Sequence, residues 1–509
     1  MEHADTAQLA ALGGALGSVL ALLARGRPAQ GAGSARRVAA ALPLLAGLLL
    51  LAVAELALAW AVGGGPLDRL SGASAAAAAA LGLVVLVAAA ALFVKRPALV
   101  PIAVLVTAPL RPPLSFDSSS ALLVQIADDG RLGRLLPLYF VLAAAASALT
   151  WRALRGDELR PLPRPVALPA AAFFAFASCS LLWADDVEAG TNLLLFFTLP
   201  FVALLATVAR ADFPPWAPRA LATAALALAT LFAAVGLWQA ATHELFFYAP
   251  NLAASNANTD YFRVTSLFGD PSLYGRHLVL GIGVALALLA TRRWKVWPLI
   301  GLVAVMWAGL LFSYSQSSMV ALLVVTVVLA LATGDRRVRR AVALLALAAA
   351  VVGCGYLALQ VANGESLNRI TSDRTNRVED AVRVIEKHPF VGVGIGGQPR
   401  ASRRLSGSER PTPNFVSHTT PLTVFAELGV IGLVLYVWLL AGGAWLILQV
   451  RRRDEALGLA LAAAFVGLFV HALFYSGFVE DPLTWFVIAV AAAYCAQPVR
   501  ELQPEAARA

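Results

Sequence analysis

The chain has 509 residues, of which 60% are hydrophobic and only 14% are charged. Because soluble domains carry about 25% charged residues, this composition excludes an ordinary soluble enzyme and indicates a protein that lies mostly in lipid. The formal net charge of +9 comes largely from arginines at the ends of apolar runs, so it does not indicate a nucleic-acid partner. The three cysteines all lie inside apolar runs and form neither a metal-binding spacing nor a disulfide framework.

Apolar runs long enough to cross a bilayer follow one another from end to end. A helix that crosses the hydrocarbon core needs about 20 residues, so we predict an all-α, polytopic transmembrane helical bundle of about 14–15 spans. Acidic residues precede the first run where a secretory signal peptide has basic ones, which favours a spanning or surface helix there. The expected spans lie near residues 7–24, 38–62, 73–94, 98–112, 135–150, 166–183, 191–209, 220–242, 275–291, 296–314, 317–333, 341–360, 421–449, 456–476 and 483–497.

Basic residues divide the linkers between these spans into two classes. One class, together with the C-terminal tail, holds 24 of the 39 lysines and arginines. This enrichment is typical of the cytoplasmic side of a membrane protein, so the other linkers are expected on the outer side. The cytoplasmic class comprises residues 25–37, 95–97, 151–165, 210–219, 292–295, 334–340, 450–455 and the tail 498–509.

The large outer loop 361–420 breaks this rule, because it carries nine basic residues against six acidic ones. One interpretation is a solvated loop that is translocated regardless of its charge. The other is a loop that binds an anion at the outer membrane surface, such as a lipid-linked pyrophosphate, since the planar guanidinium of arginine binds phosphate oxygens bidentately. The basic residues are Arg369, Arg374, Arg377, Arg383, Lys387, Arg400, Arg403, Arg404 and Arg410.

Within this loop, "SDRTNRVEDAVRVIEKHPF" predicts an amphipathic helix whose apolar stripe contains Val378, Ala381, Val382 and Ile385. Arg374 would lie near the start of this helix, where free backbone N–H groups also favour anions. The following "GVGIGG" (392–397) matches G-x-G-x-x-G only by letter, because a helix rather than a strand precedes it. We expect a flexible or anion-binding turn there rather than a dinucleotide site.

Two further outer segments contain polar residues beside predicted spans. Residues 243–274 are rich in aromatic residues, which is typical of a membrane interface, and Arg263 is their only arginine. An arginine at this depth is costly unless it is exposed or paired, so Arg263 is a candidate site residue. In the hairpin "FSYSQSS" (312–318), Ser315 and Gln316 belong either to a polar turn or to the lining of a cavity.

The order of these features resembles the O-antigen ligase and polymerase family of bacterial membrane glycosyltransferases. Arg374 is followed fifteen residues later by Pro389 and then by the glycine-rich turn. His418 opens the next span and is followed nine residues later by Glu427, and then by Gly429. These spacings are similar to those of the family.

The resemblance extends over residues 98–497, where "RVTSLFGDPSLYG" (263–275) is similar to the arginine segment of the family. Thr419 replaces the asparagine that often follows the histidine. Ser315–Gln316 stands where the family has a serine and an arginine. On this basis residues 98–497 form a twelve-span core, and residues 1–97 contribute additional N-terminal helices.

The resemblance implies transfer of a glycan from an undecaprenyl-pyrophosphate carrier at the outer face of the bacterial cytoplasmic membrane. The acceptor would be lipid A core, a growing glycan or another molecule, and membrane lipids would surround the enzyme. Arg263, Arg374 and Arg377 would bind the pyrophosphate. His418 would accept the proton of the acceptor hydroxyl, without a metal or other cofactor. Glu427 would orient helices or line the cavity.

Two alternatives remain open on the sequence. A polymerase of the same fold would join repeat units rather than attach a finished chain, and only the acceptor distinguishes it from a ligase. A transporter or exporter of lipid-linked glycan is the other alternative. Transporters typically contain internal repeats and charged or broken helices at the membrane midplane, whereas the ionisable residues here cluster at the outer surface.

Overall fold

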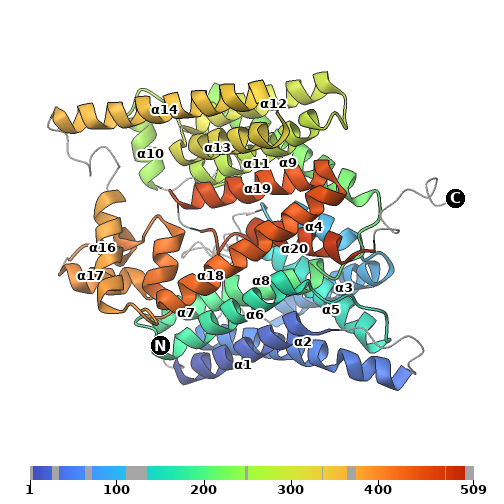
Figure 1. The fold of residues 1–509 in the computed structure, drawn as a ribbon. Coiled ribbons are helices and arrows are strands. Elements are labelled where there is room, and N and C mark those ends of the chain that lie inside the picture. Colours follow the sequence, from blue (N-terminus) through green and yellow to red (C-terminus); the bar gives the residue numbers. More distant parts are fainter. Residues whose placement is uncertain are drawn as a thin grey trace.

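The computed structural model describes residues 4–25, 34–62, 72–110, 135–246, 250–334, 336–363, 374–407, 409–475 and 477–498. All regular elements in these ranges are helices (Figure 1), which confirms the predicted helical membrane bundle. Eleven helical segments are long and apolar enough to cross a membrane, and each coincides with an expected span. Two shorter apolar segments, Ala79–Lys95 and Pro482–Ala496, lie at two further expected spans.

The helices follow in this order: α1 (Ala4–Leu23), α2 (Ser34–Val62), α3 (Gly72–Lys95), α4 (Leu99–Thr107), α5 (Leu136–Leu154), α6 (Arg164–Cys179), η3 (Ser180–Trp183), α7 (Val187–Leu193), η4 (Leu194–Thr198), α8 (Leu199–Val208), α9 (Ala217–Thr242), α10 (Pro250–Ala257), α11 (Pro271–Ala290), α12 (Val296–Ser313), α13 (Gln316–Thr333), α14 (Arg336–Ala362), α16 (Arg374–Lys387), α17 (Gln398–Ser406), η5 (Thr412–Phe415), α18 (Thr420–Arg453), α19 (Glu455–Ala472) and α20 (Pro482–Ala496).

The helices form two groups, each around its own apolar core. One core contains mainly buried residues of α1–α6, α8, α18 and α20, the other contains mainly those of α9 and α11–α13, and α19 contributes to both. In Figure 1 the first group lies below, the second lies above, and α18 to α20 pass between them. Helices α16 and α17 stand at one end of this bundle and pack on α18. The loop that was predicted to bind an anion therefore covers one end of the interface between the two groups.

Small residues explain why the alanine-rich first helix packs against its neighbour. At Gly47 of α2, an added Cβ would lie 2.4 Å from the backbone nitrogen of Ala21 in α1. Close backbone approach through glycine and alanine is the usual way in which membrane helices associate, because apolar burial alone gains little in lipid.

Two expectations about individual helices are wrong. Within the described part of the expected span 98–112, which ends at residue 110, the helix α4 is too short to cross a membrane, because it has nine residues, a length of about 14 Å against the ~30 Å hydrocarbon core. The amphipathic helix exists as α16, but Val378 and Val382 are exposed, whereas Ala381 and Val384 are fully buried. Its inner face is therefore rotated by one residue and also contains the buried Asp380.

Candidate active site

A break in α18 determines where the segment before it lies. Gly429 has φ 64° and ψ −167°, which interrupts the helical hydrogen bonds one-third of the way along α18. The turn after α16 replaces them. Val393 and Gly394 donate backbone hydrogen bonds to the carbonyls of Ala426 (3.1 Å) and Glu427 (2.8 Å), and Val430 donates to the carbonyl of Pro389 (2.8 Å). The short helix that begins after His418 is thereby fixed to the outer loop.

Two left-handed glycines allow this contact. A Cβ at Gly429 would lie 2.2 Å from the carbonyl group of Phe390, and a Cβ at Gly392 would lie 2.3 Å from that of Glu427. Both positions have positive φ, which costs other residues about 1–2 kcal/mol. Glycine is therefore required on both sides of the contact.

The expectation that "GVGIGG" is flexible or binds an anion is wrong, because its backbone N–H groups already have partners. Ile395 donates to Ser180 Oγ (3.0 Å), and Gly392 and Gly397 donate to carbonyls at 3.2 and 3.1 Å. Gly396 donates to the carboxylate of Glu427, as does Gln398 at the start of α17. Glu427 thus joins the break in α18 to the turn and to α17, and this buried side chain contacts backbone groups.

His418 lies directly before α18 and is held from both sides. The backbone N–H of Ser417 donates to Gln398 Oε1 (3.1 Å), and the Thr419 hydroxyl donates to the carbonyl of Leu473 at the end of α19 (3.1 Å). Thr419 therefore helps to fix the position of His418.

The start of α16 brings two arginines to His418. The guanidinium of Arg377 donates a hydrogen bond to His418 Nε2, and Arg377 Nε is buried without a hydrogen-bond partner among the described residues. Burial lowers the pKa of His418 to about 4, with further contributions from the charges of Arg377 and Arg374, while the carboxylate of Asp270 opposes them. Burial and the neighbouring Arg377 also lower the pKa of Arg374.

A chain of contacts leads from His418 to the serine hairpin between α12 and α13. The rings of His418 and Tyr475 have centroids 6.1 Å apart, and those of Tyr475 and His471 are 5.4 Å apart. His471 Nε2 lies 3.2 Å from Ser317 Oγ. Ser315 Oγ lies 3.2 Å from Ser317 Oγ and caps α13. The ends of α16, α18, α19 and α13 therefore meet in one place.

One protein-family model matches a part of the chain that contains most of this cluster. Residues 301–437 match the family model described as O-antigen ligase, and this range contains Arg374, Arg377, His418, Glu427 and Gly429. This part of the chain is therefore similar to the O-antigen ligase family. No curated protein matches the chain.

The O-antigen ligase match supports a membrane function in glycan transfer, with lipid-linked glycan and acceptor as the substrate class. The eleven candidate spans among the described residues indicate a multi-pass membrane protein. The matched range contains the helices that place His418 and the two arginines, which makes their meeting point the candidate active site of the ligase domain.

Arg263 lies outside the matched range, at the edge of the cluster. Its Nε donates to the carbonyl of Ser313 (3.3 Å), and its backbone is held by Asn256. Ser313 Oγ accepts the backbone N–H of Ser315 (3.2 Å), so Arg263 is connected to the site through the hairpin. Gln316 is exposed at the start of α13, whereas Ser315 is buried. The pyrophosphate-binding role of Arg263 and the cavity-lining roles of Ser315, Gln316 and Glu427 stay predictions.

The sequence analysis missed a buried ion pair beside the candidate site. Arg276 Nη2 of α11 lies 2.5 Å from Asp481 Oδ2 at the start of α20, and the two side chains are 4% and 2% exposed. The positive charge of Arg276 also acts on His471. An arginine inside an apolar span is rarely without a partner. The position of Arg276 within an expected span would therefore have indicated that it pairs with an acidic residue.

The side chains closest to His418 are guanidinium, imidazole and phenol groups, and the carboxylate of Asp270 lies near enough to act on its charge. Among the residues that the structure describes, there is no group of three or more His, Cys, Asp or Glu side chains that could hold a metal ion.

Proposed function

We propose that the protein transfers a glycan from a polyprenyl-pyrophosphate carrier to an acceptor hydroxyl at the outer face of the bacterial cytoplasmic membrane. The observation that carries this proposal is the contact between Arg377 and His418, with Arg374 beside them. A diphosphate leaving group needs fixed cations, and an attacking hydroxyl needs a base. The two requirements are met by neighbouring side chains.

In this reaction, the oxygen of the acceptor hydroxyl forms a bond to the first sugar carbon, and the bond from that carbon to the diphosphate breaks. Arg374 and Arg377 bind the diphosphate and stabilise the charge that develops on it. The buried, unpartnered Nε of Arg377 supplies a donor for this purpose. His418 accepts the proton of the acceptor hydroxyl.

The electrostatics link the strength of the base to binding of the donor. Without substrate, the arginines help to keep the pKa of His418 at about 4, which makes it a weak base. A bound diphosphate neutralises these charges and attracts the Arg377 guanidinium away from His418 Nε2. The pKa of His418 then rises, although burial still keeps it below its ordinary value of about 6.5, so the histidine becomes a stronger base when the donor is in place.

The experiment uses a deletion strain that expresses wild-type protein or a variant, followed by separation of lipid-linked and transferred surface glycan. His418→Gln and Arg374→Gln should abolish transfer while glycan accumulates on the carrier. Two exposed residues of the same loop, His388 and Lys387, provide matched controls, and His388→Gln and Lys387→Gln should transfer normally. Normal transfer by His418→Gln and Arg374→Gln at wild-type protein levels would contradict the proposal.

The same experiment separates the alternatives. Finished chains that stay on the carrier indicate a ligase, whereas single repeat units indicate a polymerase of the same fold. Glycan that stays on the cytoplasmic side indicates an exporter. Purified protein should also retain transfer in EDTA, because arginines take the electrostatic role of a metal in this scheme.

A further inference from the structure

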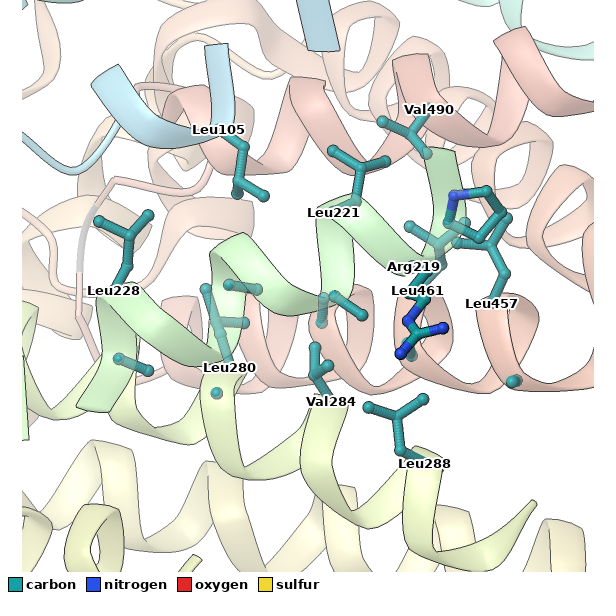
Figure 2. A pocket seen from close by; sticks show the side chains of 18 of the residues that line it. Leu105, Arg219, Leu221, Leu228, Leu280, Val284, Leu288, Leu457, Leu461 and Val490 are labelled. Carbon is teal, nitrogen blue, oxygen red and sulfur yellow. The ribbon is translucent and has the colours of Figure 1, made fainter. Parts of the chain in front are cut away.

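A cavity of about 760 Å³ lies between the two helix groups, away from His418. Its wall is mostly apolar and comes from α4, α9, α11, α12, α19 and α20; the side chains in Figure 2 include Leu228, Leu280, Val284 and Leu461. The volume is within the range of about 300–1,000 Å³ that is typical of ligand sites. None of Arg374, Arg377 and His418 lines it, so it is distinct from the ligase site.

The cavity is about as deep as one leaflet of a bilayer. On α11, its lining runs from His277 to Leu288. This stretch of twelve residues corresponds to about 17 Å of helix, which is close to half of the ~30 Å hydrocarbon core. A single acyl chain of a phospholipid fills such a depth, whereas the much longer polyprenyl tail of a carrier does not fit within it.

Charged side chains surround one end of the cavity. Arg219, Arg293 and Lys295 line it and are exposed, and Asp454 is the only acidic residue in the lining. Asp454 pairs with Arg293 at 3.7 Å, while the Arg219 guanidinium lies 5.9 Å from the centroid of the Trp294 ring. Figure 2 shows the Arg219 guanidinium pointing toward the end that Leu288 lines. This end thus has an excess of positive charge.

The linkers 210–219 and 292–295, which supply these cations, belong to the basic class that is typical of the cytoplasmic side. The anionic lipids of the cytoplasmic leaflet attract such side chains. A carrier lipid in this cavity would place its diphosphate at the membrane face opposite to His418. The charge and the depth therefore both favour a phospholipid over the carrier.

We propose that this cavity binds one acyl chain of an anionic phospholipid of the cytoplasmic leaflet, with the lipid phosphate between Arg219 and Lys295. This is a lipid site in addition to the proposed transfer site. The bound lipid would tie the two helix groups together, because it would contact α9 and α11 of one group and α4 and α20 of the other.

The test is native mass spectrometry of the full chain, released from membranes of defined composition that contain phosphatidylglycerol or phosphatidylcholine. Wild-type protein should retain one phosphatidylglycerol in preference to phosphatidylcholine. The double variant Arg219→Gln/Lys295→Gln should lose this retention roughly thirtyfold, as removal of two basic side chains from an anionic headgroup predicts. Ala225→Phe, which places a ring in the cavity, should lose it with both cations present.

A matched control removes the same charge from the same face. Arg292 and Arg452 are exposed and do not line the cavity, so Arg292→Gln/Arg452→Gln should bind lipid as the wild type does. Equal losses in the two double variants would overturn the proposal, as would equal retention of both lipids. Preferential retention of added undecaprenyl phosphate would overturn it in favour of the carrier tail.

Discussion

The guanidinium of Arg377 donates a hydrogen bond to Nε2 of His418, across 41 residues of sequence. For this nitrogen to accept, it must carry a lone pair, so the imidazole is neutral and its proton lies on Nδ1. The neutral form is also favoured by burial and by the two arginine charges, which together keep the pKa of His418 at about 4.

The first prediction concerns the pH dependence of stability. The folded-state pKa of His418 is about 4, against about 6.5 in an unfolded chain. Below pH ~6.5 the unfolded chain binds a proton that the folded protein does not, so this histidine destabilises the fold progressively as the pH falls to 4. The thermal midpoint of wild type in detergent should therefore fall relative to His418→Gln between pH 7 and pH 4. His388→Gln should follow wild type, and parallel curves for wild type and His418→Gln would contradict the prediction.

The second prediction isolates the effect of Arg377. Arg377→Gln removes a neighbouring charge and the hydrogen bond to Nε2, so the pKa of His418 should rise, although burial and Arg374 keep it below 6.5. Arg377→Lys keeps a positive charge and should give a smaller rise. The measurement is the pH dependence of His418 modification by diethyl pyrocarbonate, followed by peptide mass spectrometry. The same midpoint in wild type and Arg377→Gln would show that the arginine does not act on this histidine.

The sequence predicted the helices and the site residues for different reasons. A membrane span depends on a local property, a run of apolar residues, and eleven expected spans have matching helices. The meeting of Arg374, Arg377 and His418 came instead from the spacing typical of a family. Neither apolar periodicity nor charge alone predicts that α16 contacts the start of α18.

What could not be predicted depends on contacts between distant segments. The inner face of α16 includes Asp380 because the Ser402 hydroxyl of α17 donates to its backbone carbonyl, and Val384 packs with Val393 and Ala401. The turn 392–397 has the composition of an anion-binding loop. The N–H groups of this turn donate instead to residues beside the break at Gly429. No local sequence pattern predicts that break. The pair Arg276–Asp481 likewise joins helices 205 residues apart.

The third prediction tests the glycine contact between the turn and α18. Gly429→Ala should lower stability by at least about 1–2 kcal/mol, because of its positive φ and because the new Cβ would lie 2.2 Å from the carbonyl of Phe390. Transfer activity should fall with it, since the segment that contains His418 would shift. Gly301→Ala in α12 meets no atom within 4 Å and should be neutral or stabilising. Equal thermal midpoints for the two variants would contradict the proposed contact.

The fourth prediction concerns Glu427. Glu427→Ala leaves the N–H groups of Gly396 and Gln398 without their acceptor, which should cost about 1–3 kcal/mol. Glu427→Gln keeps an oxygen that accepts from one of them and should cost less. Glu386→Ala, at an exposed position of α16, is the control. Thermal unfolding in detergent measures all three, and a harmless Glu427→Ala would mean that the turn does not depend on this carboxylate.

The fifth prediction uses the buried pair Arg276–Asp481 to test whether the two helix groups are coupled beside the site. Arg276→Met leaves the carboxylate of Asp481 buried without its partner, which should cost about 3–5 kcal/mol. Asp481→Asn should be similarly harmful through the unpaired Arg276, although the amide oxygen can still accept from the backbone of Leu483 as the carboxylate does (2.8 Å). The double variant removes both charges, so it should be markedly more stable than the sum of the single effects implies. Additive losses in thermal unfolding would mean that the two charges act independently, and the ion pair would then not hold α11 to α20.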